Sequence, residues 1–348
     1  MKYLKKKIIK FILKKMVDVP ISYNKFQINQ KIKDLKIKNK NKFSFGKKNS
    51  DKLFYVIKIK YGGGIFSILL FVLSEIKYAQ SINAIPIIDL QNFPTKYNQK
   101  DKIKNTYNAW EYYFNNITNI SLEEVYESQN VIFSTGSPDE LMPRSWMEDK
   151  EIFEIYYKKF VKINSEFERI ANTFSKKFFS NNKVLGVHFR GKGMYNTPSH
   201  PFTPTPKQMF YKVDEYLEKY NFNKIFLVTA QQNYFELFNK KYADKLLYLN
   251  SFRCNTTKAF HYENSRLNHR YKMGRDIIVE MLLLSKLDTL ICSRSNVSQL
   301  ASLISKNKNF KAYEIWNGVN TNKILLGLFL WDIKRILPEF LGGFRKNI

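Results

Sequence analysis

Short apolar runs alternate with helix-length segments along most of the chain. The first half holds a run rich in β-branched and aromatic residues at 54–59, a glycine turn at 61–64, a helical segment at 65–81 and another strand-type run at 84–89. Apolar runs of this composition, bounded by turn residues, favour strands. A strand, glycine turn, helix and strand in this order predict the start of a doubly wound α/β sheet.

The second half repeats this pattern more regularly. Strands are predicted at 183–189, 224–229, 245–249, 289–293 and 310–315, and helices at 206–220, 232–241, 274–286, 296–305 and 321–336. Strands that alternate with helices of this length indicate a parallel sheet covered on both faces. Before this half, a short strand is predicted at 131–134 and a long helical stretch at 151–179.

The length of 348 residues favours two domains over one. We expect a basic arm at 1–50 and two Rossmann-like domains, at 51–170 and 171–348, that face a cleft. Ligands of such sheets bind beyond the carboxyl ends of the strands, so candidate chemistry is sought there.

Composition narrows the class of protein. Hydrophobic residues make up 44% of the chain and aromatic residues 16%, which excludes a disordered protein. The two cysteines, Cys254 and Cys292, lie far apart with no accompanying Cys/His cluster. This argues against a disulfide framework and a structural zinc site, and fits a reducing cytoplasm.

The formal net charge of +28 is concentrated near the N-terminus, where residues 1–60 hold 19 lysines against three aspartates. A basic surface favours a polyanion such as nucleic acid, anionic lipid or an acidic glycan, although a lysine-rich genome would also raise the background. No nucleic-acid recognition motif accompanies the charge, so we expect no nucleic-acid partner.

Residues 1–16 sharpen this picture. Leu4, Ile8, Phe11, Ile12 and Met16 recur at helical spacing among lysines. The segment is too short and too charged to span a bilayer, and it lacks the cleavage site of a signal peptide. It predicts a basic amphipathic helix that lies on an anionic membrane surface, and hence a cytoplasmic protein held peripherally at the inner membrane.

Two strand ends carry candidate chemistry. His188 and Arg190 end one strand and project to the same side, where a guanidinium can bind a phosphate; the alternative is a surface arginine and a core histidine. Ser293, Ser295 and Asn296 join another strand to a helix start, which is an anion site unless these residues only cap the helix.

A carboxylate on an apolar helix is the third candidate. Glu280 interrupts the apolar run 277–284. A buried carboxylate is costly unless it is paired, so it either accepts hydrogen bonds from a ligand such as guanine or forms a salt bridge within the protein.

Taken together, these stretches resemble the fucosyltransferase superfamily, which includes α1,6-fucosyltransferases, nodulation fucosyltransferases and protein O-fucosyltransferases. The similar segments are GVHFRG at 186–191, IFLVT at 225–229, the stretch 276–302, and the glycine-rich element 61–90 with Gly62, Gly63 and Gly64. The resemblance covers roughly residues 53–335.

The resemblance implies a GT-B fold, a GDP-sugar donor, inversion at the anomeric carbon, and no cofactor or metal. The first Rossmann-like domain would bind the acceptor and the second the nucleotide sugar. Arg190 would contact the diphosphate, His188 and Glu280 would hold the guanine, and Ser293, Ser295 and Asn296 would line the phosphate site.

The sequence also departs from the family pattern. Gly191, Lys192 and Gly193 stand where a second arginine or a Thr-Asp pair is common, and Ala230 and Gln231 stand where Asp-Asp is common. An inverting transfer needs a base for the acceptor hydroxyl unless the leaving phosphate takes the proton. His200 is the nearest titratable candidate, with a packing role as its alternative.

The function that follows is transfer of a sugar, fucose above all, from a GDP-sugar to a bacterial surface glycan or lipid-linked acceptor of capsule or lipopolysaccharide type. GDP-heptose or GDP-mannose is an alternative donor. An alternative of another class is an inactive module that binds polyanions, because the acidic positions of the family are missing.

Overall fold

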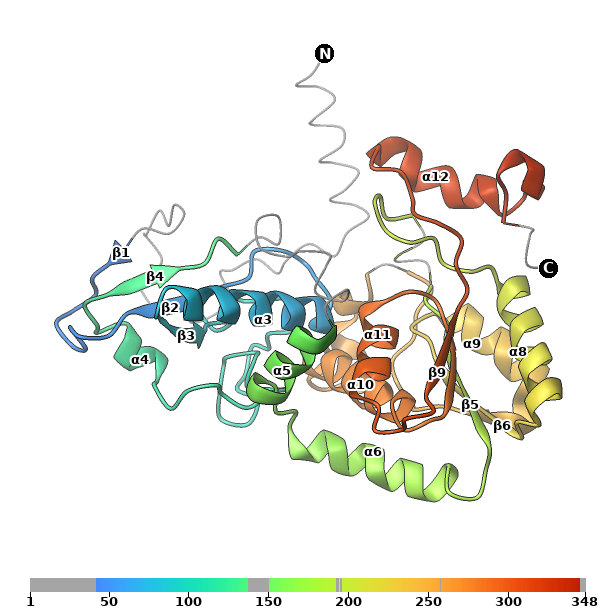
Figure 1. Ribbon diagram of the computed structural model, residues 1–348, viewed down its shortest axis with the longest axis horizontal. Coiled ribbons are helices and arrows are strands. Elements are labelled where there is room, and N and C mark those ends of the chain that lie inside the picture. Colours follow the sequence, from blue (N-terminus) through green and yellow to red (C-terminus); the bar gives the residue numbers. More distant parts are fainter. Residues whose placement is uncertain (1–41, 137–149, 192–193, 195, 257, 345–348) are drawn as a thin grey trace, which may run out of the picture. The chain divides into compact units, whose positions relative to one another are not determined.

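The computed structural model describes residues 42–136, 150–191, 194, 196–256 and 258–344 (Figure 1). The chain divides into two compact units. Among the described residues, one unit comprises Phe167–Tyr262 and the chain from Asp276 onward, and the other comprises the chain up to Glu166 together with Glu263–Arg275. Each unit contains one sheet, so the predicted α/β class is confirmed.

The larger sheet is wholly parallel. Its strands are β5 (Val184–His188), β6 (Lys224–Val228), β7 (Leu246–Leu247), β8 (Thr289–Cys292) and β9 (Lys311–Glu314), in the order β7-β6-β5-β8-β9. From β5 the chain builds outward through β6 to β7, and then returns to add β8 and β9 on the other side. The direction of winding therefore reverses between β5 and β8, which is where doubly wound sheets bind ligands.

Helices cover both faces of this sheet. They are α6 (Ser165–Phe178), α8 (Pro206–Tyr220), α9 (Gln232–Tyr242), α10 (His269–Leu284) and α11 (Asn296–Ile304). A further helix, α12 (Ile324–Lys334), follows β9. On one face, Met209 of α8 and Phe238 of α9 pack in one core cluster with Val187. On the other face, Phe174 of α6 packs on Phe226 with ring centroids 5.6 Å apart.

The smaller sheet is mixed. Its strands are β1 (Lys42–Phe43), β2 (Phe54–Ile57), β3 (Ile85–Ile88) and β4 (Val131–Phe133), in the order β1-β4-β2-β3. The strands β2, β3 and β4 are parallel, and β1 pairs antiparallel with β4. Residues 42–50 were expected to belong to a basic arm, but Lys42–Phe43 forms the edge strand β1. The winding reverses here between β2 and β4.

The smaller unit contains the helices α3 (Ile65–Ser81), α4 (Leu122–Val125) and α5 (Lys150–Phe160). On one face of the sheet, Tyr55 of β2 packs on Tyr78 of α3, and its hydroxyl donates to Glu75 at 2.5 Å. The other face packs against Val125 and Tyr126, around the end of α4. The sheet is therefore covered on both faces.

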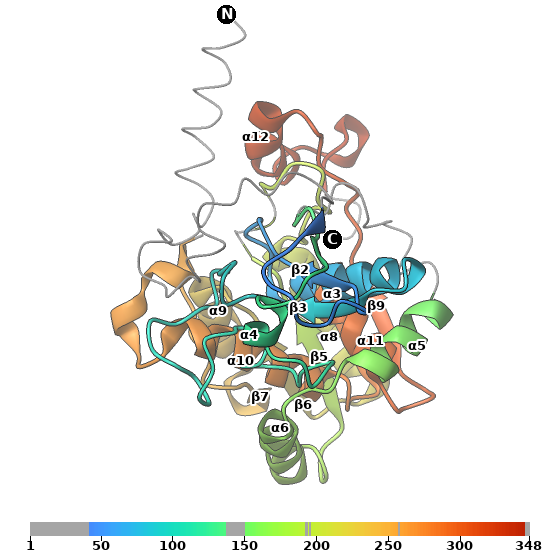
Figure 2. The same cartoon turned by 90° about the vertical axis from the view of Figure 1, so that its left-hand side faces the viewer.

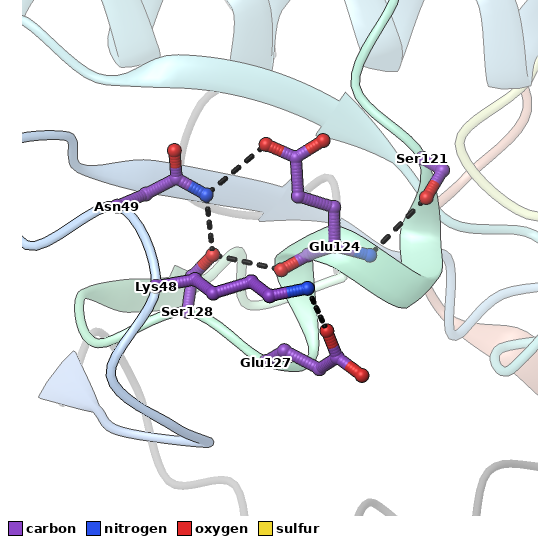
Figure 3. Close-up of polar contacts among 6 residues, drawn as sticks. All are labelled: Lys48, Asn49, Ser121, Glu124, Glu127 and Ser128. Atoms are coloured by element: carbon purple, nitrogen blue, oxygen red, sulfur yellow. Dashed lines mark hydrogen bonds and ion pairs between the residues drawn. The ribbon is translucent and has the colours of Figure 1, made fainter.

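Polar contacts fasten the segment after β1 to α4 (Figure 3). The Nζ of Lys48 lies 2.6 Å from Oε2 of Glu127, and the Nδ2 of Asn49 donates to Glu124 and Ser128 at 3.1 and 3.0 Å. An exposed ion pair of this type contributes little to stability. The backbone bond from the N–H of Lys48 to the carbonyl of Glu127 adds to the attachment of this segment.

The helical stretch predicted over 151–179 is two helices, α5 and α6. The residues between them form backbone hydrogen bonds with another segment: the N–H of Asn115 donates to Lys162, and the N–H of Asn164 donates to Tyr113, at 2.9 and 3.0 Å. Ile163 also forms an isolated bridge with Phe114. These non-local bonds use the backbone groups that a continuous helix would need.

The remaining helical elements are short 3₁₀ turns at Ala243–Lys245, Ala259–His261, Glu263–Ser265 and Glu339–Leu341. Both views show α12 set apart from the strands of its own unit (Figures 1 and 2). The amphipathic helix predicted over residues 1–16 lies outside the described residues. Within the described part of the chain, no helix combines the length and the apolar character that crossing a bilayer requires.

Candidate functional site

The carboxyl ends of β5 and β8 bring four of the predicted residues together. His188 is the last residue of β5, and Arg190 follows it by two positions. Ser293 follows β8 directly, and Ser295 is the N-cap residue of α11. The N–H of Ser293 donates to the carbonyl of His188 at 3.2 Å, so the two strand ends are joined at the point where the winding reverses.

His188 is buried and bonded to the other strand end. Its Nδ1 lies 3.2 Å from the hydroxyl of Ser295. Burial, with a smaller contribution from the charge of Arg190, lowers the pKa of His188 from 6.5 to about 3. The imidazole is therefore neutral near pH 7 and acts as a hydrogen-bonding group, not as a cation.

Arg190 is half-buried, and its backbone N–H donates to the hydroxyl of Ser293 at 3.2 Å. Burial lowers the pKa of Arg190 from 12.5 to about 10, so the guanidinium keeps its charge at neutral pH. Within the described ranges, no residue forms a hydrogen bond or an ion pair with this guanidinium. The side chain thus presents a charge that the described protein groups do not neutralise.

Gly191 fits this turn because it has no side chain. A Cβ at this position would lie 1.7 Å from Cγ of Gln231, which follows β6. The amide Nε2 of Gln231 donates to the carbonyl of Cys254 at 3.0 Å, which fixes that side chain across the glycine. A larger residue at position 191 would therefore have to displace the side chain of Gln231.

The start of α11 shows the capping role that the sequence left open. The hydroxyl of Ser295 accepts from the N–H of Ser298 at 3.2 Å, and the two residues form a capping box. Asn296 is the first residue of the helix. Capping satisfies one N–H of the first turn, while the other N–H groups and the helix dipole keep this end favourable for an anion.

Glu280 lies on α10 and is buried. Its Oε1 accepts from the hydroxyl of Ser251 at 2.7 Å. Ser251 belongs to a loop after β7 that also contains Arg253, whose guanidinium stacks over Phe235 at 4.6 Å and Tyr248 at 5.5 Å. Burial lowers the pKa of Arg253, and the charge of Glu280 opposes that shift.

The remaining predicted groups are His200 and the glycine-rich turn. His200 is exposed on a loop of the larger unit, where its Nδ1 lies 3.0 Å from the carbonyl of Pro198. Gly62, Gly63 and Gly64 belong to the smaller unit and lead into α3, with Gly64 as its N-cap residue. A Cβ at Gly63 would lie 2.3 Å from the ring of Tyr61, so this glycine is required by packing.

Sequence reasoning missed Arg253, Gln231 and Lys58. Lys58 follows β2 directly, is buried, and donates through Nζ to the carbonyl of Ser134, which follows β4. Burial and the charge of Lys60 lower its pKa from 10.5 to about 8. The predicted strand 54–59 included Lys58, whereas β2 ends at Ile57, so the signal that could have identified it is a lysine within an otherwise apolar run.

No protein-family model matches the sequence, and no curated protein sequence matches it. The chain is similar to solved structures. One is the NodZ α-1,6-fucosyltransferase co-crystallized with GDP, at 14% identity and a TM-score of 0.47, over 72% of this chain and 92% of that chain. Another is Arabidopsis thaliana FUT1, as a variant in complex with GDP, at 11% identity and a TM-score of 0.43, over 76% and 70% of the two chains. A third is POFUT1 in complex with GDP, at 10% identity and a TM-score of 0.36, over 75% and 72%.

Proposed function

We propose that the chain is an inverting glycosyltransferase with a GDP-sugar as its donor. The observation that carries the proposal is the half-buried Arg190, whose backbone N–H bonds to Ser293 shortly before α11, where the winding of the larger sheet reverses. The planar guanidinium can bind two oxygens of a diphosphate, and the helix end adds N–H donors. This pairing of donors suits a nucleoside diphosphate.

The proposed reaction requires this site to stabilise negative charge on the leaving diphosphate. The acceptor hydroxyl attacks the anomeric carbon of the sugar, the bond from that carbon to the β-phosphate oxygen breaks, and GDP leaves with the bonding electrons. Negative charge therefore grows on the diphosphate in the transition state, and a fixed cation there lowers the barrier. Arg190 fills this role, and its bond to Ser293 holds its backbone in place.

His188 and Glu280 are proposed to hold the guanine. A neutral His188, fixed by Ser295, offers a hydrogen bond without the charge that would repel the nearby arginine. The carboxylate of Glu280 is a suitable acceptor for the N1–H and N2–H groups of guanine, and its bond from Ser251 fixes its position. His200 is proposed as the base that accepts the proton of the acceptor hydroxyl.

The choice of fucose rests on the sequence resemblance, and the acceptor is proposed from charge. The lysines of residues 1–60 favour an anionic membrane surface on the cytoplasmic side, and a glycan or lipid-linked acceptor would be presented there. The basic helix at residues 1–16 is proposed to bind that membrane surface.

Nucleotide-dependent thermal unfolding tests the donor site. A ligand that binds the native state raises its stability by RT ln(1 + [L]/Kd), so GDP and GDP-fucose should raise Tm while UDP should not. Screening GDP-fucose, GDP-mannose and GDP-heptose for transfer to a glycan acceptor then identifies the sugar. If no guanine nucleotide raises Tm, the donor site is refuted and the polyanion-binding alternative takes its place.

A further inference from the structure

The helix α12 is attached to its unit by one side. Trp331 is buried there, and its Nε1 donates to the carbonyl of Thr203 at 2.8 Å. Its ring packs near Phe344, with centroids 6.4 Å apart, and Phe344 packs in turn on Phe202 at 5.2 Å. Gly327 and Leu328 are also buried. These contacts fix which side of the helix faces the protein.

The opposite side of α12 is also apolar, although it is exposed. Leu325, Leu326, Phe329 and Ile333 are exposed, and successive residues of a helix are rotated by about 100°, so these four fall within a stripe about 100° wide. Ile336, Phe340 and Leu341, in the chain just after the helix, are exposed as well. We call these seven residues the apolar stripe.

A helix on the surface of a globular protein normally carries polar residues on its outer side. Here the most exposed side chains are apolar: Phe329 is 62% exposed, Ile336 63% and Phe340 86%. Contiguous exposed apolar surface of this type marks a contact with another protein or with a membrane. The packing of the unit does not explain the four stripe residues on α12, because they lie on the side of the helix opposite Gly327, Leu328 and Trp331.

Positive charge lies beside the stripe. Lys323 precedes α12, Lys334 ends it and Arg335 follows it. Lys207 and Arg335 line an open pocket that Trp331 and Ile336 also line. Asp332 lies 3.3 Å from Arg335 and offsets part of that charge. Over residues 323–348 the sequence nevertheless holds five basic residues against two acidic ones.

We propose that the apolar stripe is a membrane-binding surface that inserts into the headgroup region of an anionic bilayer. Apolar side chains flanked by cations are the pattern of segments that lie in the membrane interface. A second copy of the chain is disfavoured as the occupant, because each copy carries a formal net charge of +28 and the two would repel. The 11 residues of α12 give a length of about 16 Å, against a hydrocarbon core of about 30 Å, so the helix lies in the interface and does not span it.

Binding of the full chain to vesicles tests this surface independently of any donor. The double variant Leu326→Glu, Phe329→Glu should bind vesicles of phosphatidylcholine and phosphatidylglycerol about tenfold more weakly than the wild type, since it places charge in the apolar part of the contact. The matched control is Leu237→Glu on α9, an exposed apolar position that should leave binding unchanged. Pure phosphatidylcholine vesicles should bind the wild type more weakly than the anionic vesicles.

A second measurement guards against misfolded variants. A tryptophan at position 329 (Phe329→Trp) should be quenched by brominated lipid when vesicles are added, whereas Leu237→Trp should not be. Equal vesicle binding by the wild type and the double variant, with no quenching at position 329, would overturn the proposal. So would a wild-type dimer in solution that the double variant converts to a monomer, because the stripe would then bind a second copy.

Discussion

The two sheets each place a basic side chain just beyond an inner strand, but the two side chains are used differently. In the smaller sheet, Lys58 donates to the carbonyl of Ser134 and its Nζ lies 5.7 Å from the ring centroid of Phe133. In the larger sheet, no described residue bonds to the guanidinium of Arg190. Both positions lie where the winding of a sheet reverses.

This difference shows that topology alone does not identify a ligand site. A reversal of winding provides a place for a ligand, but a buried charge there is costly unless it is bonded. Lys58 donates to a carbonyl within its own sheet, so we interpret it as a structural group. The guanidinium of Arg190 has no bonding partner among the described residues, so Arg190 is the better candidate for binding an anion.

The largest effect is expected from Arg190→Ala. Removing a donor that stabilises the transition state typically costs on the order of 3–4 kcal/mol, or about 10²–10³ in rate. The fold should survive, because the guanidinium makes no bond to another described residue. Turnover at saturating donor and Tm measure the two effects.

The matched control for Arg190→Ala is Arg294→Ala. Arg294 also follows a strand of the larger sheet, but its Nε lies 3.0 Å from Glu314 and its guanidinium stacks over Trp316 at 4.6 Å. We expect this variant to keep near-normal turnover. If the two variants lose turnover equally, the ion pair of Arg294 with Glu314 does not distinguish its role from that of Arg190.

The next largest effect is a loss of stability in acid that depends on His188. Its pKa is about 3 in the native state and about 6.5 when unfolded, so the unfolded chain binds more protons between these values and stability falls as pH falls through this window. The loss should be about 2 kcal/mol between pH 7 and pH 5. Denaturant titrations at pH 7 and pH 5 should show that the wild type loses about this much more free energy of unfolding than His188→Gln. An equal loss in the two proteins would contradict a buried, neutral imidazole at position 188.

Local signals explain why much of the fold could be predicted from the sequence. The helices α3 and α8 were predicted to the residue. Thr205, which precedes α8, forms a capping box with Gln208, and Pro206 begins the helix, so the start is encoded within four residues. The apolar strands of the larger sheet were likewise found from their composition.

Non-local pairing explains what the sequence could not reveal. The two residues of β1 become a strand because β4, far along the chain, pairs with them. The break between α5 and α6 depends on the segment around Asn115. The same limit applies to the site: the cap formed by Ser295 is local, whereas the bond between Arg190 and Ser293 joins residues 103 positions apart.

A smaller effect is expected from Lys58→Met, which tests the other half of the comparison. Replacing a buried charge with an apolar residue of similar volume is often neutral or stabilising, and we expect a gain of about 1–2 kcal/mol at pH 7 with little change in turnover. Between pH 8 and 10.5 the unfolded wild type binds more protons, so wild-type stability rises with pH there. The Lys58→Met variant should not gain stability over this pH range. If its stability rises as the wild type's does, another group is titrating.

The smallest effect is expected from metal removal, and it asks whether Arg190 can neutralise the diphosphate without a divalent ion. The sequence has no Asp-x-Asp cluster after a strand to hold such an ion against a diphosphate. Asp89 does follow β3, but it accepts from the hydroxyl of Tyr126 at 2.5 Å and from Asn92 at 2.8 Å, so its oxygens serve the smaller unit. A guanidinium and a helix end can supply the positive charge instead. Turnover should therefore persist in EDTA. A complete loss that Mg²⁺ or Mn²⁺ restores would mean that a metal, and not Arg190 alone, carries the charge of the leaving group.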